Sequence, residues 1–215
     1  RRRDSFTAGQ IALLACGTFW LLVAPALGLK DLTKALETVL WGFTGLYIVA
    51  VGLRTHPSIL GLPARGDTWL PLVAGLWNLA LALRWLRGDG FWSLVMACAV
   101  AIFLTSLPPF RRSKRPPAGG TWLRPFVRTS YLWLIVATAL TALAEGPLPQ
   151  LAGAARHALG SGFVVTMIVG MSLRMVCAYE VRRLLWSSGP WGLYGLLTLA
   201  TAPVTVSSLA MVSVK

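Results

Sequence analysis

The chain has 215 residues, of which 56% are hydrophobic and 13% charged, and its mean hydropathy is +0.67. Soluble domains of this length carry about 25% charged residues, so the composition excludes an ordinary soluble fold. The net charge of +13 would suggest nucleic acid in a soluble protein. Here the basic residues stand between long apolar runs, where they anchor loops at lipid headgroups, so a nucleic-acid partner is not expected.

Seven apolar runs are each near the length that crosses the hydrocarbon core of a bilayer. In lipid, the backbone polar groups of a spanning segment must be satisfied internally, so such runs form helices. We therefore predict an all-α, polytopic transmembrane protein of about seven spans. The expected spans are residues 8–28, 36–55, 68–86, 91–107, 125–144, 157–177 and 190–212.

One segment stands out as a linker between the spans. Residues 108–120 combine prolines, glycines and four basic residues, a composition typical of a solvated loop. The predicted organisation is therefore a first transmembrane bundle of four spans (1–108), a basic Pro/Gly-rich loop (109–124) and a second bundle of three spans (125–215).

The distribution of basic residues predicts the orientation. With seven spans, 14 of the 20 Lys and Arg residues fall on the side of the N-terminus and six on the other side. Loops rich in Lys and Arg stay in the cytoplasm. We therefore expect a cytoplasmic N-terminus and a C-terminus on the opposite face of the membrane.

The two bundles resemble each other at a shift of 120 positions. Residues 37–60 align with 157–180 without a gap, and the first and third spans fall on the fifth and seventh. The matched pairs include Gly42 with Gly162, Phe43 with Phe163 and Arg54 with Arg174. Since four spans separate the copies, both point the same way, which predicts a parallel internal repeat of four helices whose second copy lacks its fourth span. The competing explanation is that apolar segments resemble one another by composition alone.

The tryptophans fall into two groups. Those at span ends are expected to form an aromatic belt at the membrane interfaces: Trp69, Trp85, Trp92, Trp122, Trp186 and Trp191. The others lie deeper, where they could pack, face lipid or line a macrocyclic cofactor: Trp20, Trp41, Trp77 and Trp133.

His157 is the leading candidate for chemistry, because it stands at the mouth of the sixth span and imidazole binds haem iron or copper. At helical spacing it heads one predicted stripe of Ser161, Val164, Ile168, Met171 and Met175. The competing role is that of an ordinary interface residue. Glu37 occupies the equivalent position in the first copy, where it could bind a metal, relay protons or simply be solvated.

Two arginines and two further polar residues complete the candidates. Arg54 and Arg174 mark the inner ends of the paired spans and could contact a cofactor propionate or an anionic lipid, or offset the helix C-termini. His56 precedes Pro57 and is expected in an inner loop, whereas Asn78 lies mid-span and is expected to join helices by a hydrogen bond. The sequence contains no motif for hydrolysis, phosphoryl transfer or hydride transfer.

Residues of the second half resemble the NnrS family. In the second half, the residues that carry the resemblance are the stretch 126–137 (FVRTSYLWLIVA) and Arg156, His157, Gly162, Phe163, Met167, Ile168, Gly170, Met171 and Arg174. In the first half, they are Gly42, Phe43, Arg54, His56, Pro57 and Gly61.

The resemblance implies a bacterial inner-membrane protein associated with haem or copper and with the response to nitric oxide, in which histidines at span mouths are ligands. It implies that His157 is such a ligand. The chain departs from the family in two ways. It has about seven spans, whereas the family has about twelve, and it carries Glu37 where the repeat suggests histidine. The expected topology places His56 and His157 on opposite faces, so they cannot share one haem.

Two functions stay open at this level. The first is an NnrS-like protein that binds or senses rather than turning over a large substrate, with haem or copper at His157. The second is a non-catalytic accessory subunit of a larger respiratory or photosynthetic membrane complex, without a cofactor, because ionisable groups inside the spans are few. A transporter would be expected to show discontinuous helices with polar centres, which the sequence does not indicate.

Overall fold

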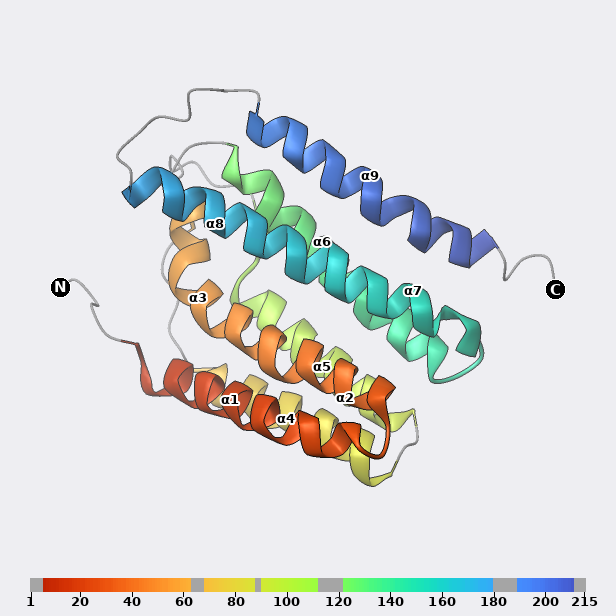
Figure 1. Cartoon of the computed structure of the whole chain (residues 1–215). Helices are drawn as coiled ribbons and strands as arrows, with labels where there is room; N and C mark the ends of the chain where they lie inside the picture. Colours follow the sequence, from red (N-terminus) through yellow and green to blue (C-terminus); the bar gives the residue numbers. More distant parts are fainter. Residues whose placement is uncertain (1–5, 63–67, 88–89, 112–121, 180–188, 211–215) are drawn as a thin grey trace. The chain divides into compact units, whose positions relative to one another are not determined.

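The computed structural model describes residues 6–62, 68–87, 90–111, 122–179 and 189–210, and over these ranges it is all-helical, without strands (Figure 1). The helices form seven rods. Five of the rods are named by a single helix: α1 (Ala8–Gly28), α4 (Leu70–Leu86), α5 (Phe91–Ser106), α6 (Leu123–Ala144) and α9 (Gly189–Ala210). The second rod is α2 (Leu32–Thr38), η1 (Val39–Gly45) and α3 (Leu46–Leu60). The sixth is η2 (Pro149–Leu151), α7 (Ala152–His157), η3 (Ala158–Val165) and α8 (Thr166–Tyr179).

Four of these rods are long and apolar enough to cross a membrane: Ala8–Gly28, Leu32–Leu60, Leu123–Ala144 and Pro149–Met175. The helices α4 and α5 are apolar but shorter, with 17 and 16 residues. The predicted all-helical fold is therefore confirmed, with four helices that could span a bilayer among the described residues.

The second and sixth rods begin earlier than predicted. Asp31 caps α2 by accepting a hydrogen bond from the Lys34 backbone N–H at 3.0 Å, so this helix starts before the apolar run. In the other rod, Pro149 opens a 3-10 turn that leads into the alanine-rich α7. As a result, Glu37 and His157 lie inside their rods and not at the first residue.

The expectation that His56 lies in a loop is wrong. His56 is buried within α3, and the helix continues through Pro57 to Leu60. Pro57 has no N–H to donate to the Leu53 carbonyl four positions earlier, yet the helix continues across it. Ser58 Oγ donates to the Thr55 carbonyl at 2.7 Å in this last turn.

A π-helical segment interrupts each of the two long rods. Its hydrogen bonds run from residue i to i+5, and the Thr166 hydroxyl likewise reaches back five positions, to the Ser161 carbonyl at 3.2 Å. The wider turn rotates the side chains that follow out of the ordinary helical register. The predicted stripe below His157 is therefore not one face, because Val164 is buried whereas Ile168 is 50% exposed.

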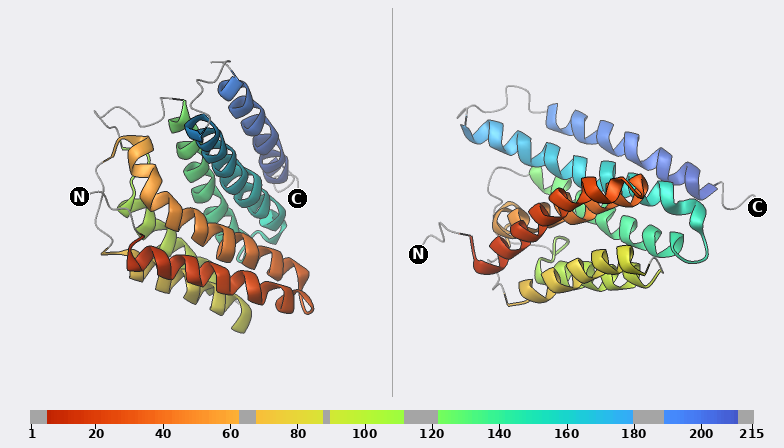
Figure 2. Two further views of the ribbon diagram at one scale, coloured as in Figure 1. Left: turned by 60° about the vertical axis from the view of Figure 1, so that its left-hand side comes forward. Right: turned by 60° about the horizontal axis from the view of Figure 1, so that its bottom comes forward.

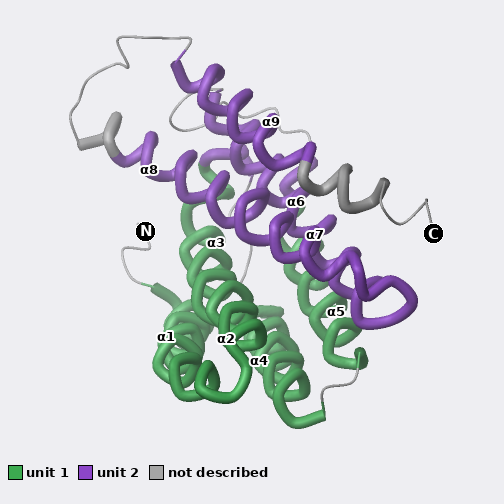
Figure 3. Tube along the Cα trace, turned by 45° about the vertical axis from the view of Figure 1, so that its right-hand side comes forward, with its two compact units in different colours: residues 1–58, 63–108 green, residues 59–62, 109–215 purple. Residues whose placement is uncertain are grey.

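The described chain divides into two compact units (Figure 3). Unit 1 comprises Arg1–Ser58 and Pro63–Pro108, and unit 2 comprises Ile59–Leu62 and Pro109–Lys215. Most of the predicted basic loop, residues 112–121, lies outside the described residues.

Each unit packs its first helix against a long rod. In unit 1, α1 packs on α2, on η1 and on α4, and α4 pairs with α5. In unit 2, the rod of α7, η3 and α8 lies between α6 and α9 (Figure 2). Each π-helical segment thus packs against the first helix of its unit, η1 against α1 and η3 against α6.

Candidate functional site

His157 is the last residue of α7 and directly precedes the π-helical segment η3. Its Nδ1 lies 3.4 Å from the Ser161 hydroxyl, one turn along the rod. The other ring nitrogen, Nε2, is buried and has no hydrogen-bond partner among the described residues. A histidine ligand commonly has one nitrogen held by a neighbouring group, and Ser161 lies in that position beside Nδ1 of His157.

The surroundings of His157 distinguish between kinds of metal site. No group of three or more His, Cys, Asp or Glu side chains that could hold an ion occurs within the described ranges. A metal site built from three such side chains therefore does not form among these residues. Haem needs only one axial histidine from the protein, since its macrocycle supplies the other nitrogens. A single imidazole is thus the one ligand that this part of the protein could offer to a haem iron.

Glu37, the position equivalent to His157, has a partner in unit 1. Arg84 Nη2 of α4 lies 2.6 Å from Glu37 Oε2, and the side chains are only 12% and 13% exposed. The carboxylate is therefore paired and largely buried, and the expectation of a merely solvated Glu37 is wrong. Because one of its oxygens accepts from Arg84, Glu37 is a poorer candidate for a metal ligand than His157.

Aromatic side chains surround this ion pair. The Arg84 guanidinium carbon lies 4.9 Å from the centre of the Trp92 ring, and Lys34 Nζ lies 5.8 Å from that of Trp85. The Trp85 indole donates to the Thr38 hydroxyl at 2.8 Å. Cations over tryptophan faces gain most where water is excluded, so these contacts stabilise the charges inside unit 1.

Trp92 does not belong to an aromatic belt, as the sequence suggested, because it is only 1% exposed. The ring is buried beneath Arg84, a contact that its place at the start of a span did not reveal. Trp69 and Trp191 are about half exposed at helix starts, as a belt requires, and Trp186 lies outside the described residues.

The deeper tryptophans of unit 1 act in packing. The Trp20 indole donates to Asn78 Oδ1 at 2.7 Å, which joins α1 to α4 and confirms the role expected of Asn78. The Trp77 indole donates to the Trp41 carbonyl at 2.9 Å, and both rings are buried. Trp133 of unit 2 is half-buried and lies against Gly162.

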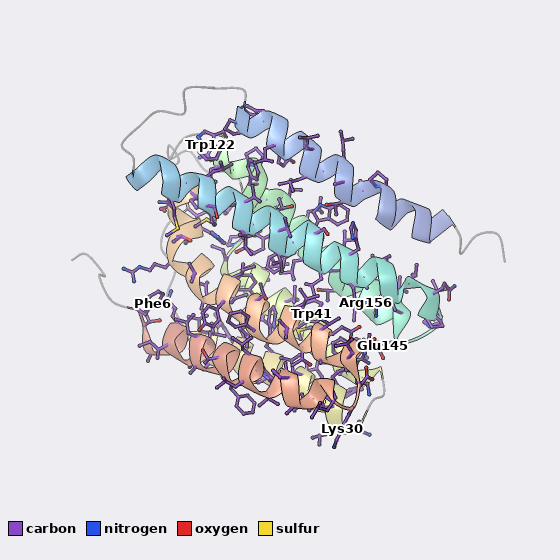
Figure 4. All side chains as sticks on the ribbon, in the orientation of Figure 1. Phe6, Lys30, Trp41, Trp122, Glu145 and Arg156 are labelled. Carbon is purple, nitrogen blue, oxygen red and sulfur yellow. The ribbon has the colours of Figure 1, made fainter. Side chains whose placement is uncertain are left out.

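The two arginines of the predicted site lie in their expected rods. Arg54 is exposed in α3, with its guanidinium carbon 4.9 Å from the centre of the Phe6 ring. Phe6 and Lys30 are at opposite ends of α1, so Arg54 lies at the end away from Glu37 (Figure 4). Arg174 is half-buried in α8. Within unit 1, Arg54 and Glu37 therefore do not form one site.

Sequence reasoning missed Arg84 as the partner of Glu37, and Trp92 as the ring beneath Arg84. Arg84 was counted only as a basic residue near a span end, and 47 positions separate it from Glu37. The available signal was the presence of a carboxylate and an arginine near the same end of neighbouring spans.

Comparison of the chain with models of protein families, with curated proteins and with solved structures found no match.

Proposed function

We propose that this chain is a seven-span protein of the bacterial inner membrane, NnrS-like, in which His157 holds a haem, or copper, in the response to nitric oxide. Its N-terminus lies in the cytoplasm. The protein binds or senses through this group rather than turning over a large substrate. The single observation that carries the proposal is the buried Nε2 of His157, which is without a partner in the described part of the chain while Ser161 holds Nδ1.

The proposal includes a parallel repeat, which two observations support. The π-helical segment Val39–Gly45 coincides with positions 159–165 of Ala158–Val165 at the 120-residue shift. π-Helical turns are rare and occur mostly at functional sites, so two at matched positions favour duplication over chance.

The second observation concerns matched glycines of the π-helical segments. A Cβ on Gly42 would lie 2.8 Å from Trp20 Cβ of the preceding helix, and one on Gly162 would lie 2.5 Å from Trp133 Cγ. Each glycine therefore permits the same close approach of a long rod to a tryptophan of the helix before it.

An accessory subunit of a larger membrane complex is the second candidate function. The observation in its favour is the apolar surface of α9, where Trp191, Leu196 and Leu199 are 50%, 66% and 69% exposed. Such a surface suits contact with lipid or with the apolar helices of a partner.

An optical spectrum of the full chain, purified from membranes of haem-sufficient bacteria, tests the proposal. The expected result is a Soret band that is lost in His157→Ala. Ser161→Ala keeps the band, because Ser161 only orients the ring. The matched control is Gly160→Ala, which adds a methyl where no atom lies within 4 Å.

Elemental analysis of the same preparations covers the copper alternative. Copper bound to the native chain and absent from His157→Ala assigns the site to that metal. A colourless, copper-free chain that co-purifies with a large complex supports the accessory role. An unchanged spectrum and metal content in His157→Ala rules out His157 as the ligand.

A further inference from the structure

We propose that the helix pair α4 and α5 of unit 1 thins the lipid bilayer beside it and therefore gathers phospholipids with short acyl chains. The inference rests on the seven-span topology of the proposed function, in which both helices cross the membrane. The two helices lie side by side (Figure 2). Their contact with lipid is the α4–α5 surface, defined as the exposed side chains Leu72, Leu79, Phe91, Leu94 and Cys98.

Both helices are shorter than the hydrocarbon core of a bilayer. The helix α4 has 17 residues and α5 has 16, so at 1.5 Å per residue they are about 26 Å and about 24 Å long. Described residues set their ends, because α4 lies between its caps Trp69 and Arg87, and α5 between Gly90 and Leu107. A typical hydrocarbon core is about 30 Å thick, so each helix is about 4–6 Å too short.

The other adjustments open to a short helix do not remove this mismatch. Tilting reduces the length of a helix along the membrane normal, so it increases the shortfall. A long basic side chain near a helix end can extend to the headgroups, but α5 contains no Lys or Arg. In the last turn of α4, Arg84 is directed to the Glu37 carboxylate and lies over the Trp92 ring. Thinning of the bilayer is the adjustment that remains.

The first helix of the same unit is long enough for an ordinary bilayer. The helix α1 has 21 residues, about 32 Å. A Cβ on Gly9 would lie 3.1 Å from Leu70 Cβ, so α1 and α4 start at one level. From that level α1 continues for about 28 Å and α4 for about 24 Å. The thinning is therefore confined to the lipid beside α4 and α5.

Cys98 provides a native probe for the test, because it is exposed near the middle of α5. In a Cys16→Ala/Cys177→Ala background it is the one thiol, and it is labelled with a fluorophore. The full chain is reconstituted in brominated dioleoyl phosphatidylcholine, which quenches the fluorophore, mixed with an unbrominated competitor. Dimyristoleoyl phosphatidylcholine is expected to relieve the quenching about threefold more effectively than dioleoyl phosphatidylcholine, because its shorter chains match α4 and α5.

The matched control is Phe19→Cys in a chain that also carries Cys98→Ala. Phe19 is 54% exposed near the middle of α1, so the label has a similar depth beside a longer helix. No preference for the shorter lipid is expected there. Equal relief of quenching by the two lipids at Cys98 would refute the inference. The same preference for the shorter lipid at Phe19→Cys would also refute it, since the effect would belong to the whole protein.

A separate experiment shows whether the helix pair crosses the membrane at all. In the background without native cysteines, Arg87→Cys at the end of α4 is expected to react with a membrane-impermeant maleimide from outside intact cells. No reaction would refute the thinning and the seven-span topology together. A labelled Arg87→Cys combined with equal relief of quenching at Cys98 would refute the thinning alone.

Discussion

Arg84 and Glu37 form a 2.6 Å ion pair across unit 1, between two helices that the sequence separates by 47 positions. Charged groups within apolar helices are rare and are usually paired with one another. At a shift of 120 residues, Glu37 of this pair aligns with His157 of unit 2. The residue at the same shift from Arg84 is Val204, so the sequence does not repeat this pair in the second half.

Breaking the ion pair is expected to destabilise the protein strongly. Glu37→Leu or Arg84→Leu alone leaves one charge uncompensated in a largely buried place, at a cost of about 3 kcal/mol in the free energy of unfolding. The double variant Glu37→Leu/Arg84→Leu removes both charges and should lose less than either single variant. Unfolding in mild detergent, titrated with dodecyl sulfate and followed by circular dichroism, measures all three. Additive losses in the double variant would show that the two groups do not interact.

The hydrogen bond from Trp20 to Asn78 is expected to contribute modestly. Asn78→Leu keeps most of the side-chain volume and removes the acceptor, and interhelical hydrogen bonds in membrane proteins contribute about 1 kcal/mol. The same unfolding titration measures the loss, with Leu79→Ala, next to Asn78 but 48% exposed, as the neighbouring control. If Trp20→Phe and Asn78→Leu lose stability independently in the double variant, the bond has no energetic role.

The glycines of the π-helical segments are expected to tolerate no methyl group. Gly42→Ala and Gly162→Ala place a carbon within 2.8 Å and 2.5 Å of a tryptophan of the preceding helix. Such overpacking costs about 1–3 kcal/mol.

The matched control for this pair is Gly75→Ala, which meets no atom within 4 Å and should be neutral or up to about 1 kcal/mol more stable through helix propensity. Thermal unfolding in detergent compares the three variants. Equal melting temperatures in all three would mean that the helices do not approach closely at these glycines.

Features of the fold that depend on the local sequence could be predicted, whereas features that depend on contacts between distant residues could not. Apolar runs predicted α1 at its exact bounds and α4 and α5 within two residues, because hydropathy is a local property. The π-helical segments were not predicted, since they depend on how the rods pack at Gly42 and Gly162. His56 was placed in a loop because proline usually ends a helix, and only the surrounding fold keeps α3 intact.

The candidate site was predictable in part for the same reason. His157 could be selected because it is one of only two histidines in the chain and imidazole is a common metal ligand. The pairing of Glu37 with Arg84, and the burial of Trp92 beneath it, arise from contacts between helices. The only indication of such contacts in a single sequence was a carboxylate and an arginine near the same end of neighbouring spans, which does not establish that the two side chains meet.

The direct test of the central proposal, seven spans with termini on opposite faces, is cysteine accessibility in intact bacterial cells. In a background where Cys16, Cys98 and Cys177 are replaced by alanine, Ser5→Cys and Ser213→Cys each provide one thiol. A membrane-impermeant maleimide is expected to label Ser213→Cys in intact cells and Ser5→Cys only after the membrane is opened. Labelling of both positions from the same side would establish an even number of spans and contradict the proposed topology.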